Sequence, residues 1–524
     1  MMILSSAPSA GGGAKVFKGS VQFPTQLLLL LSTLLLSMWA SAQPFSLVIN
    51  HGRVIDPESG LDAIRHIGIQ GDKIVAISQQ PLQGEQVIDA NSLVVSPGFI
   101  DLHTHSPTPL GQYYQMFDGV TTALELEAGA YPVTDYGVQI KEQPLLNYGA
   151  SAGYVSMRVL QKQGIEVAHT TAKPMPVNLN GVITGIKTLF MPLEEALSDT
   201  FHEPADEADL AALRELINLG LNDGAFGIGL ALDYISEAVN EKEINMIFDA
   251  AAQRGAPLFI HIRRGINGDP SGLREVLALA KKHNASLHIC HISHNAMGNL
   301  KLFLSEISQA RAEGVDVTTE VLPHNAGSTL ISAAVFSRDW QTIFNISYGD
   351  VEWAPTGERF TEESWFRIRA DHPKSGVIHH YLKEEWTQLA VQSPGVIIVS
   401  DLLPMESKDK KVAPNNGTFS RVLGKYVREQ GLLDLPTALA KMTLLPAQRL
   451  ENYAPQFKNK GRIKVEADAD ITIFNADTII DKATYQSPYQ EGVGFSHVIV
   501  NGVQIMKDSK LVDGVYPGKH LLKQ

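Results

Sequence analysis

Apolar strand-like segments alternate with helical patterns through the middle of the chain, from about residue 96 to residue 451. Repeated strand–helix units of this length predict a parallel sheet, because a helix must carry the chain back between neighbouring parallel strands. Eight strands are expected, which is the number that closes a TIM barrel. They are the strand that ends at His103 and the segments 121–126, 153–159, 224–230, 257–262, 286–292, 315–320 and 395–399.

The two ends of the chain differ from this middle. Short strand-like runs punctuated by turns extend over 45–88, and similar runs recur at 470–474 and 498–502. The simplest arrangement is one small discontinuous β-sandwich domain built from both chain ends. The predicted fold is therefore α/β, with a TIM (β/α)8 barrel over residues 97–450 and the β-sandwich domain over 43–96 and 451–524.

The first 42 residues have the pattern of a signal peptide. Two lysines precede an apolar stretch over 27–39, and Ala40-Ser-Ala42 forms a small-x-small cleavage pattern. The stretch is short for a membrane span, although an uncleaved anchor is the alternative. We expect a signal peptide over 1–42, a mature protein that begins near Gln43, no membrane association after cleavage, and a periplasmic or secreted location.

Composition narrows the classes of partner. The 524 residues include 43 Lys and Arg against 56 Asp and Glu, for a formal net charge of -13. This balance argues against a nucleic-acid partner. A single cysteine excludes an internal disulfide framework. The sequence leaves the oligomeric state open, a homo-oligomer included.

A His-x-His pair, His103 and His105, stands at the end of the first predicted barrel strand. Side chains at positions i and i+2 of a strand point the same way. Both imidazoles can therefore reach one metal ion. Asp101 lies two residues before the pair, and an apolar run leads into it.

Three more polar side chains stand where predicted strands end: His261, His291 and Asp401. In a TIM barrel the functional groups gather at the carboxyl ends of the strands, so all five side chains are expected in one place. Imidazole and carboxylate ligands with an open position suit Zn²⁺, which makes a usable hydroxide from bound water. Asp401 would accept the proton of that water and pass it to the leaving group. This set predicts hydrolysis of an amide or related bond in a small molecule.

These features resemble the amidohydrolase superfamily over nearly all of the chain after residue 42, and within it the D-aminoacylase (N-acyl-D-amino-acid deacylase) branch. The most specific string is Gly417-Thr-Phe-Ser-Arg-Val-Leu-Gly424, followed by Tyr426-Val-Arg428. The resemblance implies a zinc-dependent hydrolase of carbon–nitrogen bonds other than peptide bonds, with one or two ions. It implies His103, His105, His261 and His291 as metal ligands and Asp401 as the catalytic residue. Further matches are Gly119-Val-Thr-Thr122, 224–230 with Tyr234, His261-Ile-Arg263, 325–329, 441–443 and 469–470.

One ligand of the family is missing. D-aminoacylases carry a cysteine near the end of strand 2, and an ungapped match places Ala128 there. The adjacent Glu127 is the predicted replacement. Glu125, two residues earlier on the same strand, is one alternative, and a carboxylated Lys187 is the other.

The substrate end of the predicted site holds several candidates. Arginine pairs with carboxylates in bidentate fashion, so Arg263 or Arg264 is expected to hold the α-carboxylate of an acyl-amino acid, unless it forms a structural ion pair. Tyr234 could donate to the carboxylate or carbonyl of the substrate. His324 stands where the family tends to have tyrosine. The family lysine two residues past the strand-6 histidine is replaced by Ser293, with His294 next to it, and both departures suggest an altered pocket.

The remaining candidate side chains are expected to have no role in the site. Cys290 neighbours His291, and because neighbours on a strand face opposite sides, it is expected to be an inert buried thiol outside the barrel lumen. A surface or packing role is expected for five other histidines, namely His51, His169, His283, His379 and His380.

Three functions compete. The first is deacylation of N-acyl-D-amino acids, which the 417–424 string and the strand-2 glutamates favour. The second is hydrolysis of cyclic amides or isoaspartyl dipeptides by the same superfamily, which the lack of a lysine on a convincing fourth strand weakens. The third is a non-catalytic scaffold on this fold, which the retained histidines and Asp401 argue against. The acyl group, the amino-acid side chain and the choice between D and L substrates are left open by the sequence.

Overall fold

The computed structural model describes residues 11–13, 15, 45–169, 171, 173–187, 197–409, 411 and 413–524. Most of the expected signal peptide, including its apolar stretch and cleavage pattern, lies outside the described residues. A compact unit runs from Phe45 to Gln524. Within the described residues, no helix combines the length and the apolar character that a membrane crossing needs.

Eight parallel strands form a barrel, which confirms the predicted TIM barrel. Its two edge strands meet just beyond their last paired residues. There the Asp401 amide donates to the His103 carbonyl (2.8 Å) and the Ser400 amide donates to the Asp101 carboxylate (3.1 Å). In sheet order the strands are β19 (Val396–Ile398), β14 (Val317–Val321), β13 (Leu287–Ile289), β12 (Leu258–His261), β11 (Ile228–Ala231), β8 (Asn147–Gly153), β7 (Val120–Ala130) and β6 (Phe99–Asp101).

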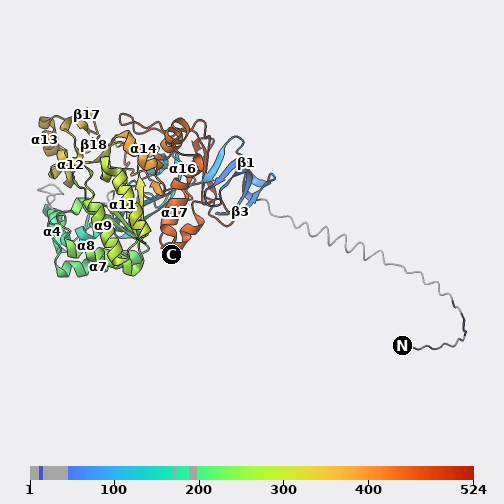
Figure 1. Ribbon diagram of the computed structural model, residues 1–524, viewed down its shortest axis with the longest axis horizontal. Coiled ribbons are helices and arrows are strands. Elements are labelled where there is room, and N and C mark those ends of the chain that lie inside the picture. Colours follow the sequence, from blue (N-terminus) through green and yellow to red (C-terminus); the bar gives the residue numbers. More distant parts are fainter. Residues whose placement is uncertain are drawn as a thin grey trace, which may run out of the picture. The chain divides into compact units, whose positions relative to one another are not determined.

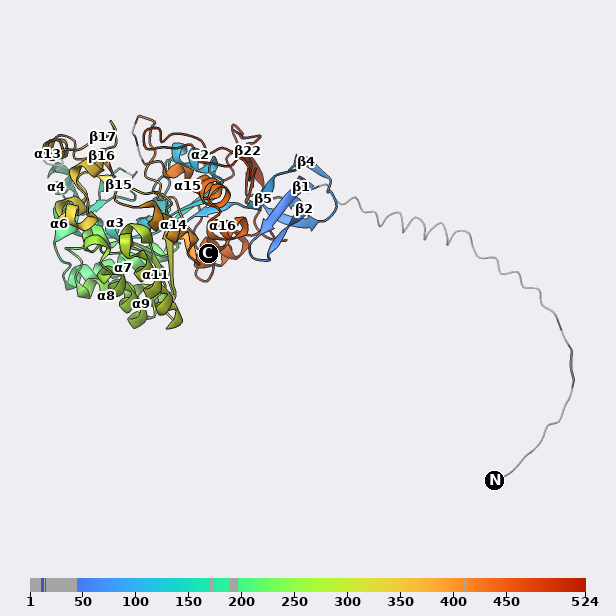
Figure 2. The ribbon, with the colours of Figure 1, turned by 45° about the horizontal axis from the view of Figure 1, so that its top comes forward.

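Helices cover the outside of the barrel, and α7, α8, α9 and α11 lie side by side in both ribbon views (Figure 1, Figure 2). Their ends follow from local sequence. The Asp206 side chain caps α7 within a capping box, and Gly255 ends α8 in the left-handed conformation that glycine adopts freely. The covering helices are α2 (Pro109–Met116), α3 (Tyr154–Gln163), α7 (Glu207–Asn222), α8 (Glu241–Arg254), α9 (Ser271–His283), α11 (Leu300–Ala312), α14 (Glu384–Gln392), α16 (Leu435–Met442) and α17 (Leu444–Glu451).

The third predicted strand, 153–159, is wrong. The observed strand β8 ends at Gly153, and helix α3 begins at Tyr154. Tyr154, Met157 and Arg158 are buried at the spacing of one helix face, so the segment has a period of 3.6 residues rather than 2. A short apolar run does not distinguish a buried strand from a buried helix by itself. The other seven predicted strands overlap observed barrel strands.

Strands from both chain ends build a nine-stranded sheet, in agreement with the predicted β domain made from both ends. β5 (Val94–Pro97) pairs antiparallel with β20 (Ile471–Phe474), which places Val95 opposite Ile473. Figure 2 shows the blue N-terminal strands beside the red β22. The exact domain boundaries stay predictions. The other strands of this sheet are β1 (Phe45–Asp56), β2 (Leu61–Gln70), β3 (Lys73–Ser78), β4 (Gly84–Asp89), β21 (Phe495–Val500), β22 (Val503–Lys507) and β23 (Lys510–Leu511).

A subdomain that the sequence did not reveal is inserted between β14 and α14. It has its own aromatic core, which includes Phe336, Trp340 and Trp365. Its four strands run in the order β15 (Gly327–Leu330), β18 (Gly376–His379), β16 (Val351–Trp353) and β17 (Glu358–Arg359), and its helices are α12 (Trp340–Phe344) and α13 (Glu362–Asp371). A second excursion, between α3 and α7, contains β9 (Ile165–Glu166), β10 (Met175–Pro176), α4 (Leu179–Lys187) and α6 (Ser198–His202).

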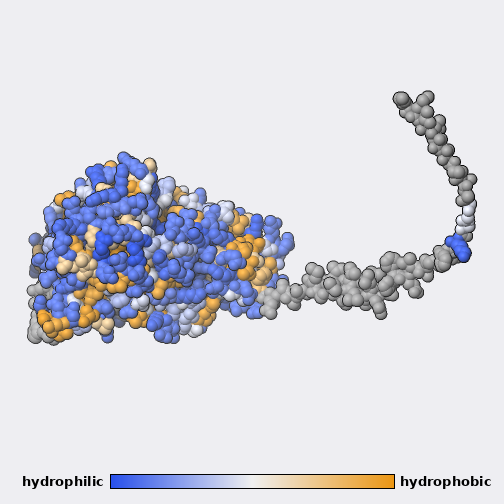
Figure 3. All heavy atoms as spheres, turned by 90° about the horizontal axis from the view of Figure 1, so that it is seen from below, coloured by the Kyte–Doolittle hydropathy of each residue, from blue (hydrophilic) through white to orange (hydrophobic). Residues whose placement is uncertain are grey.

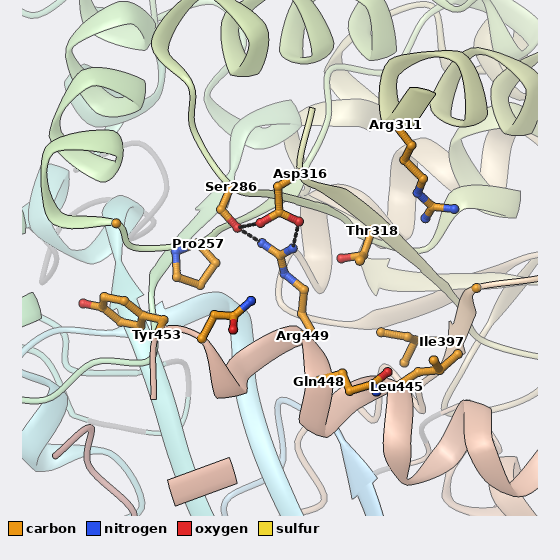
Figure 4. Close-up of a pocket in the computed structure, with 13 residues that line it drawn as sticks. Pro257, Ser286, Arg311, Asp316, Thr318, Ile397, Leu445, Gln448, Arg449 and Tyr453 are labelled. Carbon is orange, nitrogen blue, oxygen red and sulfur yellow. Dashed lines mark hydrogen bonds and ion pairs between the residues drawn. The ribbon is translucent and has the colours of Figure 1, made fainter. Parts of the chain in front are cut away.

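The amino ends of the barrel strands enclose a cavity of about 300 Å³ (Figure 4). Pro257, Ser286 and Asp316 directly precede β12, β13 and β14 and line it. Arg449 of α17 is fixed there by Asp316 (2.9 Å) and by the Ser286 hydroxyl. This end of a TIM barrel serves stability, and the contacts tie α17 to the barrel. The face of the molecule in Figure 3 is mainly hydrophilic, with apolar side chains in small groups.

Candidate metal centre

The structure brings the His-x-His pair and Asp401 together where β6 and β19 end. The Nε2 atoms of His103 and His105 lie 3.2 Å apart. Asp401 Oδ1 lies 3.2 Å from His105 Nε2 and 3.5 Å from His103 Nε2. Both histidines are buried, whereas the Asp401 side chain is 24% exposed and is therefore open to a substrate.

The second pair of histidines lies across the mouth of the barrel. His261 is the last residue of β12, and His291 is the N-cap residue that precedes the short helix α10 (Ile292–Ala296), just past β13. The His291 backbone is left-handed, with φ of 33°. This conformation is uncommon for a residue other than glycine and is frequently found at functional sites. The two imidazole rings are edge to face, with centroids 4.4 Å apart.

Glu127 of β7 joins the two pairs. Its Oε1 lies 2.9 Å from His261 Nδ1 and 3.0 Å from His291 Nε2. Its Oε2 lies 3.3 Å from His103 Nε2 and 3.5 Å from His105 Nε2. Each carboxylate oxygen thus faces one pair of histidines. Burial alone would raise the pKa of Glu127, but the charge of His103 and hydrogen bonds from the histidines hold that pKa well below its ordinary value.

These spacings fit metal coordination. Ligand atoms about 2.0–2.1 Å from a tetrahedral Zn²⁺ lie about 3.3 Å from one another. The distances around Glu127 and Asp401 range from 2.9 to 3.5 Å. The residues therefore fit one ion among His103, His105 and Asp401 and a second between His261 and His291, both against Glu127. Imidazole nitrogen and carboxylate oxygen form a donor set that divalent zinc accepts readily.

Two further glutamates orient the first pair of histidines. Glu125 Oε2 lies 2.6 Å from His105 Nδ1, and Glu320 Oε1 lies 2.6 Å from His103 Nδ1. With Nδ1 engaged in this way, each imidazole turns its Nε2 toward the cluster. Burial would raise the pKa of Glu125, but the charge of His105 and its hydrogen bonds lower it to about 2. Among the three alternatives for the extra ligand, only Glu127 lies at the centre, since Glu125 lies behind His105 and Lys187 is exposed at the end of α4.

The expectation for Cys290 is wrong in part. The thiol is buried, and burial raises its pKa well above the ordinary value. It does not lie outside the lumen, because its sulfur lies within 4.8 Å of ligand atoms of His103 and Glu320. Cys290 stands two residues after His288 and shares its side of the chain, whereas His291 follows the end of β13 at Ile289 and has a left-handed backbone, so the two neighbours do not face opposite sides.

Sequence reasoning also missed several residues behind the cluster. His169, expected to have a surface or packing role, is 3% exposed and lies 2.8 Å from Glu125. His288 holds Glu320 at 2.8 Å. Glu320 ends a predicted strand, as Asp401 does, so its position at a strand end was the available signal. No pattern in the sequence connects His169 to the barrel.

The two adjacent arginines have different roles. Arg263 is structural, because its Nε contacts Glu275 (3.0 Å) and its Nη atoms donate to the carbonyls of Ser236 (2.5 Å) and Val239 (2.7 Å). Arg264 instead faces the cluster, with Nη2 3.4 Å from His261 Nε2.

The Arg264 guanidinium lies 5.0 Å from the Phe344 ring and 6.0 Å from the Tyr381 ring, both supplied by the inserted subdomain. It forms no ion pair with a carboxylate of the described residues, and its buried Nε has no hydrogen-bond partner among them. The nearby Asp233 is taken by Arg338 at 2.9 Å. Among the described residues, Arg264 therefore has no carboxylate partner.

The other substrate candidates lie at different distances from the cluster. The Tyr234 ring meets the His261 ring edge to face, at 5.3 Å. Burial raises the pKa of Tyr234, which keeps its phenol protonated and able to donate. His324 is buried against the Thr418 hydroxyl (3.1 Å), and burial lowers its pKa well below the ordinary value. His294 packs beside His291, with ring centroids 6.0 Å apart.

Comparison with known proteins shows which enzymes the chain resembles. No protein-family model matches the chain. It is 29% identical over 483 residues to an N-acyl-D-glutamate deacylase of Alcaligenes xylosoxydans xylosoxydans, which covers 88% of this chain and 94% of the relative. It is 26% identical over 510 residues to a D-aminoacylase of the same organism, over 92% and 99% of the two chains. Over most of its length the chain therefore resembles the D-aminoacylase branch of the amidohydrolase superfamily.

A solved structure has the same fold. The N-acyl-D-glutamate deacylase of Bordetella bronchiseptica superposes with a TM-score of 0.74 at 22% identity, over 92% of this chain and all of the other. That crystal structure holds zinc and a phosphonate inhibitor that mimics the tetrahedral intermediate. The likeness supports the shared fold, and the relatives together support a hydrolase.

Proposed function

We propose that this protein removes the acyl group from N-acyl-D-amino acids, with zinc as its metal. The observation that carries the proposal is the position of Glu127, whose two oxygens face two histidine pairs at coordination spacing, with Asp401 beside one pair. The deacylase names of the relatives supply the reaction class.

Different residues of the chain would hold the metal and transfer the proton. His103, His105, His261, His291 and Glu127 would hold the metal, which supplies Lewis acidity and an acidified water when bound. Asp401 Oδ1 accepts a proton from the attacking water and delivers it to the departing amine nitrogen.

The backbone around Asp401 is held from both sides. The Asp401 amide donates to the His103 carbonyl, and the Asn415 side-chain amide donates to the Asp401 carbonyl (2.9 Å). The carboxylate therefore stays beside the histidine pair through proton uptake and release.

The substrate is held by its carboxylate. Arg264 lacks an anionic partner among the described residues and lies beside His261, so an α-carboxylate bound there would place the adjacent amide near the cluster. Tyr234 adds a neutral phenol donor next to the same histidine. A bidentate guanidinium–carboxylate pair fixes orientation as well as affinity.

The proposal is tested by amine release from matched N-acetyl-D- and N-acetyl-L-amino acids, with bound metal measured in the same sample. We expect turnover of the D series that chelation abolishes and Zn²⁺ restores. Bound metal without turnover of either series would favour a cyclic-amide or isoaspartyl-dipeptide substrate. Neither metal nor turnover would favour a non-catalytic scaffold.

We also propose a periplasmic or secreted location, on the strength of the apolar stretch and cleavage pattern before Gln43. Fractionation of expressing cells, with N-terminal sequencing of the product, should recover a chain that starts near Gln43 outside the cytoplasm. Intact chain in the cytoplasm would contradict this.

A further inference from the structure

Two buried carboxylates behind the cluster each hold two histidines. Glu125 Oε2 lies 2.6 Å from His105 Nδ1 and 2.8 Å from His169 Nε2. On the other side of the cluster, Glu320 Oε1 lies 2.6 Å from His103 Nδ1, and its Oε2 lies 2.8 Å from His288 Nε2. Among the hydrogen bonds and ion pairs of the described residues, none joins His169 or His288 to Glu127 or Asp401.

Both outer histidines are anchored at their far nitrogen. His288 Nδ1 lies 2.7 Å from the Thr318 hydroxyl, and His169 Nδ1 lies 3.3 Å from the Thr171 hydroxyl. The His169 ring also packs edge to face on Tyr136, at 5.2 Å. These contacts fix the ring planes, so each Nε2 is aimed at a glutamate oxygen. A nitrogen that faces a carboxylate at 2.8 Å is placed to donate a hydrogen bond.

The outer contacts matter because Glu125 and Glu320 are fully buried. A buried carboxylate needs donors at several of its lone-pair positions, and its rotamer is free unless those donors hold it. If His169 is lost, Glu125 Oε2 keeps only His105, and the Ala128 amide holds only the other oxygen, Oε1 (3.1 Å), so Oε2 can turn away from the inner imidazole. The inner imidazole then loses the contact that keeps its Nε2 directed at the metal.

We propose that His169 and His288 are positioning residues, which lock Glu125 and Glu320 so that His105 and His103 present Nε2 to the metal ion. The two His–Glu–His series thereby set the affinity of the centre for its metal. This inference rests on the proposed function only in that the cluster binds a metal ion. It does not depend on the substrate.

The two His–Glu–His series differ in the part of the fold that supplies the outer histidine. His288 lies on β13 next to Glu320 on β14, inside the barrel and against the Phe259 ring (5.3 Å). His169 lies in the excursion after α3, outside the barrel strands, and the neighbouring Ala168 carbonyl accepts from Tyr131 (2.9 Å). A substitution at His169 therefore leaves the barrel core intact, which makes it the deciding variant.

The experiment measures Zn²⁺ affinity by competition with a chromophoric chelator, with the Zn²⁺ ion alone as probe. The variants are His169→Leu, which removes the donor at similar size, and His169→Gln, which restores a donor. His283→Leu, a partly exposed histidine at the end of α9, is the matched control. Thermal unfolding of the metal-free proteins checks that each variant folds.

We expect His169→Leu to weaken Zn²⁺ binding about 10–100-fold, as the loss of an outer partner does in other metal sites. His169→Gln should recover most of the affinity, and the control should match the wild type. Equal affinity of wild type and His169→Leu would overturn the inference while leaving the proposed function standing. Tight Zn²⁺ binding without deacylation would contradict the function alone. A wild type that binds no Zn²⁺ would overturn both.

Discussion

Glu127 sets the balance of charge in the cluster. Four imidazoles surround one buried carboxylate, and two more carboxylates, Glu125 and Glu320, lie behind the first histidine pair. Without metal, burial opposes the charge of His105, yet the carboxylates around it, with Glu125 foremost, raise its pKa to about 10. A divalent ion would replace those protons, so metal uptake should release protons.

Asp401 is the residue whose loss should affect chemistry more than binding. In Asp401→Asn the amide cannot accept the proton of the attacking water, so kcat should fall about 10²–10⁴-fold. The histidines and Glu127 remain, so most bound metal should be kept. Steady-state kinetics and metal analysis of the same preparation check both points, with exposed Asp409→Asn as control. Full activity in an Asp401→Asn protein with intact metal would show that another group moves the proton.

Arg264 should determine recognition of the substrate carboxylate. Arg264→Gln removes a charge-assisted contact of about 1.5–3 kcal/mol, so kcat/KM for an N-acyl-D-amino acid should fall about 10–100-fold. The matching N-acyl-D-amino-acid amide has no carboxylate, and its kcat/KM should change little. Arg263→Gln is the neighbouring control, which should lower stability rather than recognition because Arg263 is engaged with Glu275. An equal loss of kcat/KM on both substrates would mean that Arg264 does not bind the substrate carboxylate.

At the scale of elements, local patterns predicted most barrel strands and the gathering of five site residues at one end of the barrel, but not which of these side chains contact one another. His103, His261 and Asp401 were found because each follows an apolar strand. The helix α3 was mistaken for a strand because its apolar run is short. The inserted subdomain was missed because its strands have two to four residues and its core is aromatic rather than periodic. Its Phe344 and Tyr381 nevertheless reach Arg264.

Helix α16 carries a buried lysine that makes stability depend on pH. Lys441 Nζ donates to the carbonyls of Ser393 (2.5 Å) and Val396 (3.0 Å) at the start of β19, and burial lowers its pKa from 10.5 to about 8. Between these two values the unfolded chain binds more protons than the folded one. The contribution of Lys441 to the free energy of unfolding therefore rises with pH across this window.

Lys441→Met should remove the rise of the free energy of unfolding with pH. The free energy of unfolding of the wild type, measured by urea at pH 7 to 10, should increase relative to that of the variant as pH passes from 8 to 10. The control is Lys482→Met, an exposed lysine whose curve should run parallel to that of the wild type. Parallel curves for Lys441→Met and wild type would mean that the buried ammonium keeps its proton.

At the scale of the whole molecule, the barrel joins residues that are far apart in the chain. His103 and Glu320 are 217 positions apart, and His261 and Glu127 are 134 apart. The sequence could place each near the mouth of a barrel, but not in contact, because strand order alone does not fix which side chains meet. The residues of the centre come from five barrel strands, β6, β7, β12, β13 and β19, so the centre exists only when the barrel is closed. Metal binding should accordingly stabilise the folded protein by mass action.

We infer that Glu127 joins two histidine pairs into one catalytic metal centre. The most direct measurement titrates Zn²⁺ into chelator-treated wild type and Glu127→Gln, following bound metal and hydrolysis of an N-acetyl-D-amino acid together. The wild type should gain activity in step with one or two bound ions. Glu127→Gln, which keeps the shape but loses the charge, should bind Zn²⁺ far more weakly and stay inactive, while the exposed control Glu237→Gln behaves like the wild type. Equal metal uptake and equal turnover by Glu127→Gln and wild type would contradict the account.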